Sequence, residues 1–208
     1  MDNSQISLYL FDFDGTLVDS RESLYPVFKA GYSVVGRDVT KEEASLWMHY
    51  NILESIAMSG VPEDKWPLVV ESIIKSLDLP EAMAMIHLFP ETVEVLKELK
   101  AHGKRIGIVS NNASGHIKNV LNTLHVDIVF DTIVGSDMVE NGKPAPDLVF
   151  KAMELTGETD LGSIVYIGDS LQDPECAKNV GTNGILIDRH NEHPDFSGRI
   201  IKSLKELL

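Results

Sequence analysis

Two aspartates separated by one residue are the first feature of the sequence that could carry out chemistry. Asp12 and Asp14 directly follow a short apolar run, and Gly15 then permits a tight turn. Residues two apart project to the same side of an extended chain, so both carboxylates can serve one site. The same Asp-x-Asp pattern also occurs in ordinary turns that cap a helix. The pair alone favours neither interpretation.

Three further polar clusters follow later apolar runs. They are Ser110-Asn111-Asn112, Gly142-Lys143-Pro144-Ala145-Pro146 and Gly168-Asp169-Ser170-Leu171-Gln172-Asp173. Each alone is more often a turn, a solvated lysine or a carboxylate at a helix N-terminus than a functional site. In an open parallel sheet, however, ligands bind in the crevice at the carboxyl ends of the strands. The four clusters together therefore predict one crevice that contains carboxylates, an ammonium group and groups that bind an anion.

The apolar pattern predicts the strands and helices that position these clusters. We expect buried strands at Ile6–Phe11, Arg105–Ser110, Thr132–Val134, Ile164–Ile167 and Ile185–Ile187. We expect amphipathic helices at Glu91–His102, Ala113–Leu124, Pro146–Thr156 and Leu171–Val180. This alternation is typical of an α/β fold, in which helices flank a parallel sheet.

The segment after the first strand breaks the alternation, because it shows helical periodicity without a convincing strand. The expected helices are Arg21–Val35, Lys41–Met58, Glu63–Leu77 and a short one at Glu81–His87. We therefore predict a core domain of residues 1–16 and 88–208. An all-helical cap domain of residues 17–87 is inserted into it after the first strand.

Four carboxylates that converge on one crevice would repel one another unless a cation offsets them. The clusters gather only oxygen ligands, with no His or Cys at ligand spacing. A hard, six-coordinate ion such as Mg²⁺ fits this donor set, and Zn²⁺ does not.

The motifs resemble those of the haloacid dehalogenase superfamily of phosphotransferases. The stretches Phe11–Ser20, Gly142–Asp147 and Tyr166–Ser170 are similar to the branch of phosphoglycolate phosphatases and β-phosphoglucomutases. That branch carries a helical cap after the first strand, and its core is a Rossmann-like parallel sheet flanked by helices. The resemblance extends over the whole chain, although the cap matches in position and helicity more than in motif.

The resemblance implies a role for each motif residue. Asp12 would be the nucleophile that forms an aspartyl-phosphate, and Asp14 would be the acid and base. The phosphoryl oxygens would be bound by Thr16, Ser110, Asn111 and Lys143. The metal ligands would be the carboxylates of Asp12 and Asp169 and the carbonyl of Asp14, with Asp173 assisting directly or through water.

The charge and composition limit the partners. The chain has 208 residues and a net charge of -14, which argues against a nucleic-acid or anionic-membrane partner. Cys176 is the only cysteine, so no intrachain disulfide can form. No apolar run approaches the roughly 18 residues that span a membrane. We expect a cytoplasmic protein, a monomer or a homodimer, that binds a small phosphorylated metabolite.

The predicted function is that of a Mg²⁺-dependent phosphatase acting on a small phosphomonoester of the phosphoglycolate or sugar-phosphate type. Asp14 disfavours a haloacid dehalogenase, which needs no second aspartate as acid and base. A sugar-phosphate mutase of the same family shares all four motifs and stays open as an alternative. A catalytically silent binding or regulatory member is the other alternative, and the intact motif residues weigh against it.

Overall fold

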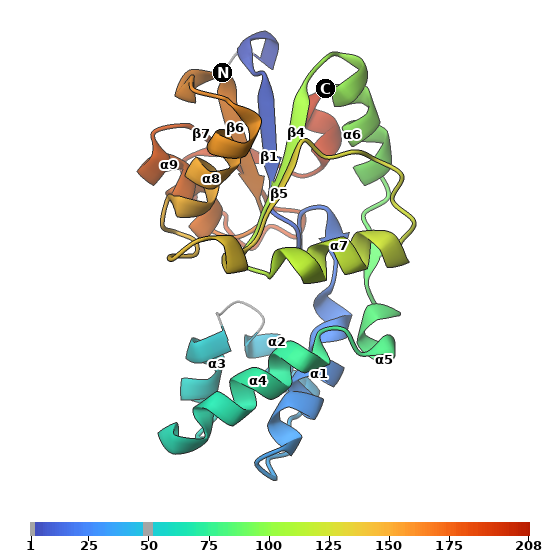
Figure 1. The fold of residues 1–208 in the computed structure, drawn as a ribbon, viewed down its shortest axis with the longest axis vertical. Coiled ribbons are helices and arrows are strands. Elements are labelled where there is room, and N and C mark those ends of the chain that lie inside the picture. The colour runs from blue at the N-terminus through green and yellow to red at the C-terminus, as the bar shows by residue number, and fades with distance from the viewer. Residues whose placement is uncertain (1–2, 48–51) are drawn as a thin grey trace. The chain divides into compact units, whose positions relative to one another are not determined.

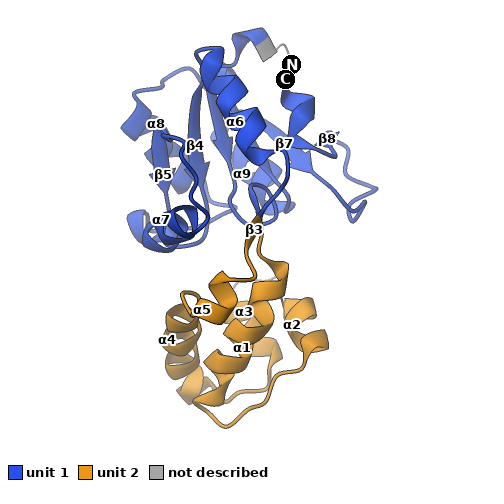
Figure 2. Cartoon of the chain, turned by 90° about the vertical axis from the view of Figure 1, so that its right-hand side faces the viewer, with its two compact units in different colours: residues 1–18, 88–208 blue, residues 19–87 orange. Residues whose placement is uncertain are grey.

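A computed structural model describes residues 3–47 and 52–208 of the chain (Figure 1). The chain divides into two compact units (Figure 2). Met1–Val18 and Leu88–Leu208 form what we call the core unit, and Asp19–His87 form the helical unit. The first boundary lies two residues after the one expected from the sequence. Val18 belongs to the core unit because its N–H donates to the carbonyl of Phe13 and its carbonyl accepts from the N–H of Gly15.

The core unit contains a parallel sheet of six strands in the order β5-β4-β1-β6-β7-β8. The strands are β1 (Leu8–Phe11), β4 (Arg105–Val109), β5 (Thr132–Val134), β6 (Ile164–Gly168), β7 (Asn183–Ile187) and β8 (Arg199–Ile201). The predicted Rossmann-like parallel sheet is confirmed. The edge strand β8 was not predicted from the sequence.

Helices cover both faces of this sheet. They are α6 (Thr92–Ala101), α7 (Ser114–Thr123), α8 (Asp147–Thr156) and α9 (Gln172–Val180), with short 3₁₀ helices at Asn3–Gln5, Ser136–Met138, Leu161–Ser163 and Leu204–Leu207. Figure 1 shows α8 and α9 on one side of the sheet and α6 on the other. Apolar residues of α8 and α9 pack on Leu8, Leu10 and Tyr166 of the central strands. Within the described parts of the chain, no helix has the length and apolar character needed to cross a membrane.

The helical unit packs around an aromatic core. Its elements are a 3₁₀ turn at Arg21–Ser23, α1 (Leu24–Ser33), α2 (Lys41–Trp47), α3 (Ile52–Met58), a 3₁₀ turn at Glu63–Lys65, α4 (Trp66–Ser76) and α5 (Pro80–Met83). Phe28 meets Trp47 edge to face with ring centroids 5.6 Å apart, and Tyr32 lies 5.1 Å from the same ring. These aromatic pairs supply much of the buried area that a unit of this size needs.

One expectation for this unit was inexact, and another lies partly outside the described residues. The expected helix Lys41–Met58 is described as α2 and α3, and residues 48–51 between them lie outside the described part of the chain. The expected helix Glu81–His87 is the shorter α5, which ends at Met83, and His87 belongs to a strand. That strand, β3 (His87–Leu88), pairs with β2 (Val18–Asp19), so both chain crossings between the units are extended.

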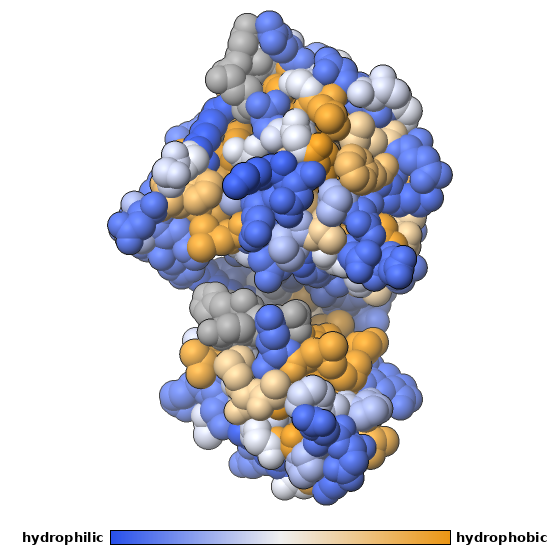
Figure 3. Space-filling model, turned by 90° about the vertical axis from the view of Figure 1, so that its left-hand side faces the viewer, coloured by the Kyte–Doolittle hydropathy of each residue, from blue (hydrophilic) through white to orange (hydrophobic). Residues whose placement is uncertain are grey.

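Hydrophobic side chains remain exposed on the surface of the helical unit, where Figure 3 shows orange patches. An apolar groove of about 670 Å³ is lined by Leu53, Trp66, Val70 and Ile74, among others. Leu53 and Ile74 are each more than half exposed.

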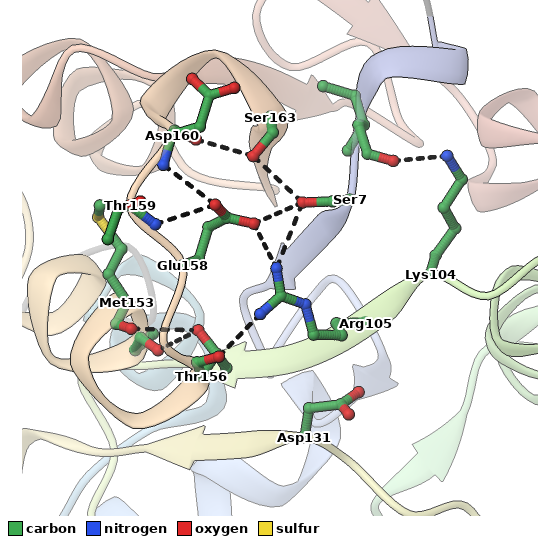
Figure 4. Close-up of polar contacts among 12 residues, drawn as sticks. Ser7, Lys104, Arg105, Asp131, Met153, Thr156, Glu158, Thr159, Asp160 and Ser163 are labelled. Atoms are coloured by element: carbon green, nitrogen blue, oxygen red, sulfur yellow. Dashed lines mark hydrogen bonds and ion pairs between the residues drawn. The ribbon is translucent and has the colours of Figure 1, made fainter.

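A polar network joins the amino ends of three adjacent strands in the core unit (Figure 4). Ser7 precedes β1, Arg105 begins β4 and Ser163 precedes β6. The Ser7 hydroxyl donates to Glu158 Oε2 at 2.6 Å, and Arg105 forms an ion pair with the same carboxylate. The backbone N–H groups of Thr159 and Asp160 donate to Glu158 Oε1 at 2.9 and 3.0 Å. Glu158 is therefore the acceptor at the centre of this network.

We predict that Glu158 makes stability depend on acidic pH. The hydrogen bond from Ser7, with the backbone donors and Arg105, lowers the pKa of Glu158 from 4.5 to about 2. Its contribution is present above pH 4.5 and is lost as the pH falls toward 2. In urea unfolding, Glu158→Gln should lower the free energy of unfolding by about 1.5–3 kcal/mol at pH 7. The difference from wild type should shrink below pH 4, and a difference that is constant with pH would contradict this prediction.

Candidate active site

The carboxyl ends of adjacent strands bring the sequence-predicted clusters together. Asp12 follows β1, Ser110 follows β4 and Asp169 follows β6. Strand β1 lies between β4 and β6, and Phe11 pairs with Ile108 on one side and Ile167 on the other. The three strands therefore end at nearly the same level, and Asp12 occupies the middle position of the crevice.

A buried ion cluster lies at the centre of the site. Lys143 Nζ lies 2.9 Å from Asp12 Oδ1 and 2.7 Å from Asp173 Oδ1. The side chains of Lys143, Asp12 and Asp173 are 5%, 9% and 0% exposed. One ammonium group thus contacts two carboxylates in a region that water hardly reaches, where charge interactions are strong.

The electrostatics of this cluster leave an excess of negative charge. Burial raises the pKa of Asp12 to about 7, although Lys143 opposes the shift. Burial and the neighbouring Asp12 raise the pKa of Asp169 well above its usual range. Burial alone would lower the pKa of Lys143, but Asp12 and Asp173 outweigh it and raise the pKa. The lysine therefore stays protonated, while the carboxylates lack enough positive charge to hold all of them ionised.

The donor set of the cluster fits a hard cation. Oxygen atoms of Asp12, Asp169 and Asp173 all lie within 4.8 Å of one another, so the three side chains could share one ion. A divalent ion would offset the charge excess and favour the ionised carboxylates. The oxygen-only set suits an ion such as Mg²⁺.

Two hydrogen-bond donors orient Asp173. The Tyr166 hydroxyl lies 3.0 Å from Asp173 Oδ1 and 3.0 Å from the carbonyl of Val109. The N–H of Ser170 donates to Asp173 Oδ2 at 2.9 Å. Gly168 leaves room for this carboxylate, since a Cβ there would lie 2.1 Å from its carboxyl carbon. Sequence reasoning missed Tyr166, although a tyrosine in an otherwise aliphatic buried strand signals a hydroxyl that needs a partner.

The second cluster supports the loop that carries the lysine. The N–H of Lys143 donates to Asn111 Oδ1 at 2.7 Å. Ser110 is buried, and its Oγ accepts from the N–H of Asn112 at 3.2 Å. The side-chain amide of Asn112 donates to Asp14. Sequence reasoning noticed Asn112 within the cluster but gave it no role.

An arginine donates a hydrogen bond to the turn after Asp12. Sequence reasoning gave this arginine no role. Arg189 Nη2 donates to the carbonyl of Thr16 at 3.1 Å, and Nη1 pairs with Glu91 Oε1 at 2.5 Å. The guanidinium group lies over the Phe89 ring, 3.7 Å from its centroid. Thr16 itself is fully buried, and its hydroxyl has no hydrogen-bond partner among the described residues.

The chain shares sequence and fold with known proteins. The sequence model of the haloacid dehalogenase-like hydrolases matches residues 9–187. A phosphoglycolate phosphatase from Aquifex aeolicus is 28% identical over 90% of each chain. A phosphoglycolate phosphatase from Escherichia coli K12 is 28% identical over 95% of this chain and 89% of its own length. A crystal structure from Bacteroides fragilis, assigned to the haloacid dehalogenase-like hydrolases, superposes with a TM-score of 0.85 at 27% identity, over 98% of this chain and 100% of the other.

We predict that Mg²⁺ stabilises the protein through Asp169. At Mg²⁺ concentrations about 100 times the dissociation constant, binding should raise the melting temperature of the wild type by about 5–10 °C. Asp169→Asn should abolish this rise. Because this substitution removes one crowded carboxylate, the melting temperature of the variant in chelator should be no lower than that of wild type. Scanning fluorimetry with and without Mg²⁺ measures both effects, and exposed Asp64→Asn is the control. Equal Mg²⁺ shifts in wild type and Asp169→Asn would contradict the site.

Proposed function

Because the chain belongs to the haloacid dehalogenase-like hydrolase family, we propose that it is a Mg²⁺-dependent phosphatase. It hydrolyses a small phosphomonoester through an aspartyl-phosphate formed on Asp12. The observation that carries the proposal is the contact of Asp12 with Lys143 beside Asp169 and Asp173. This contact brings together a candidate nucleophile, the ammonium group of Lys143 and the carboxylates that could bind a divalent metal ion.

Asp12 acts as the nucleophile, and its charge is the quantity that the site must control. Burial raises the pKa of Asp12 to about 7, whereas attack on phosphorus needs the ionised carboxylate. The ammonium of Lys143, 2.9 Å away, favours that form. Asp12, Asp169, the carbonyl of Asp14 and Asp173 would hold a divalent ion, which would supply further positive charge for phosphoryl transfer.

Asp14 serves as the acid and the base. It protonates the alkoxide when the ester bond breaks, and it then accepts a proton from the water that hydrolyses the aspartyl-phosphate. Asp14 is partly exposed, whereas Asp12 is buried. The two carboxylates can therefore take different roles because their surroundings differ.

The phosphoryl oxygens are bound by groups from three loops. These groups are the Ser110 hydroxyl, the Asn111 N–H, the Lys143 ammonium and the hydroxyl of Thr16. Lys143 is the only one with a full positive charge, so it contributes most where charge is redistributed during transfer.

The substrate class follows from the charge of the protein and from its relatives. An anionic ester meets a chain of net charge -14, so attraction must come from local groups in the crevice. This favours a small monoester, of the phosphoglycolate or sugar-phosphate type, over a polyanion. The relatives named phosphoglycolate phosphatase support the same class. The location of this protein in the cytoplasm stays a prediction from the sequence.

We predict that Asp12→Asn abolishes phosphate release, because an amide is a poor nucleophile. The experiment is a Mg²⁺-dependent assay over a panel of small phosphomonoesters, followed by mass spectrometry of acid-quenched wild type. The phosphate should be found on Asp12, and the variant should still unfold in one cooperative thermal transition. Phosphate attached to a residue other than Asp12 would refute the mechanism. Formation of an isomeric sugar phosphate in place of inorganic phosphate would identify a mutase.

We predict that Lys143→Met slows turnover by about 10²–10³-fold, the usual loss for one such electrostatic contact. It should also destabilise the metal-free protein by about 3–5 kcal/mol, because two buried carboxylates lose their partner. Lys143→Arg should rescue poorly, since a planar guanidinium does not fit the space of a compact ammonium. Exposed Lys178→Met is the control. Wild-type turnover in Lys143→Met would show that the lysine has no catalytic role.

A further inference from the structure

We propose that Asn112 is a positioning residue that holds the carboxylate of Asp14 in the orientation its acid and base steps require. The inference rests on the proposed function. Asn112 Nδ2 donates a hydrogen bond to Asp14 Oδ2, across 98 residues of sequence. A carboxylate only accepts hydrogen bonds when ionised, so the amide nitrogen is the end of the side chain that must face it.

The backbone of Asn112 is fixed on both sides, which makes its amide a rigid donor. Its N–H donates to Ser110 Oγ at 3.2 Å, and its carbonyl accepts from the N–H of Ser136 at 2.9 Å. Gly135 packs so closely that a Cβ there would lie 2.6 Å from the Asn112 carbonyl oxygen. Only the two side-chain torsions of Asn112 remain to be ordered, so holding Asp14 costs little conformational entropy.

The turn that carries Asp14 is equally confined. Gly15 adopts a φ of +70°, and a Cβ at this position would lie 1.9 Å from Asp169 Oδ2. The Asp169 carboxylate therefore occupies the space where a side chain at position 15 would lie. The side chain of Asp14 is only partly buried, so packing alone does not select its rotamer. The hydrogen bond from Asn112 contributes to that selection.

The orientation matters because Asp14 moves a proton in both chemical steps. In the first, Asp12 forms a bond to phosphorus, the ester bond breaks, and Asp14 gives its proton to the departing oxygen. In the second, Asp14 takes a proton from water while the water oxygen attacks phosphorus and the bond to Asp12 breaks. An aryl ester releases a stable phenolate that needs no proton, so only an alkyl ester depends on Asp14 in the first step.

This difference gives a test that a purely structural role would fail. The first-turnover rate of leaving-group release is measured with 2-phosphoglycolate and with p-nitrophenyl phosphate, using the full chain in Mg²⁺. Asn112→Ala should slow release from the alkyl ester by about 10- to 100-fold and from the aryl ester by less than about 3-fold. The phosphoenzyme should persist longer with both esters, because its hydrolysis needs the base.

Two further variants sharpen the experiment. Asn112→Asp keeps the shape but replaces the donor by a carboxylate, so it should slow the alkyl ester at least as much as Asn112→Ala. It also keeps the test available if the alanine variant folds poorly. Asn122→Ala, at an exposed position of α7, should behave as wild type.

The outcomes separate this inference from the proposed function. Equal slowing of both esters in the first turnover, or wild-type rates in Asn112→Ala and Asn112→Asp, would overturn the positioning role and leave the phosphatase intact. Absence of a phosphoenzyme in the wild type would overturn the proposed function, and this inference with it.

Discussion

The ammonium group of Lys143 between two buried carboxylates is the constraint on which the site depends. Asp12 comes from the central strand, Asp173 from α9, and Lys143 from the loop after β5, two strands away. That loop must be held firmly for the lysine to reach the centre. The side chain of Asn111 accepts a hydrogen bond from the N–H of Lys143, and the side chain of Asn179 donates to the carbonyl of Pro144 at 3.0 Å. Asn111 and Asn179 therefore help to keep one positive charge in place.

The sequence predicted most of the strands and helices of the core unit because apolar runs and helical periodicity are local signals. It also predicted which four loops carry the motif residues, since three of the polar clusters directly follow an apolar run and the cluster with Lys143 precedes an expected helix. It did not predict β8 or β3. These features depend on short segments whose pairing or packing partners lie elsewhere in the chain.

The residues that sequence reasoning overlooked share one property. Asn112 and Arg189 donate to Asp14 and Thr16, and the Tyr166 hydroxyl lies within hydrogen-bond distance of the Val109 carbonyl, so each pairs with a residue far away in the sequence. No periodicity encodes such a pairing, and the same residue types are common on protein surfaces. Only the tertiary structure reveals that these donors contact the motif residues or their neighbours. The motifs identify the groups proposed for the chemistry, whereas the tertiary structure identifies the groups that support them.

The polar network around Glu158 has a consequence for how this protein can change. It joins the amino ends of β1, β4 and β6, and the candidate site lies at the carboxyl ends of the same strands. Enzymes commonly trade activity for robustness, because catalytic groups are crowded, charged and costly to the fold. Here the groups proposed for activity and the network proposed for stability lie at opposite ends of the same strands. Substitutions that strengthen the Glu158 end can thus compensate for a costly active site during evolution or engineering without touching it.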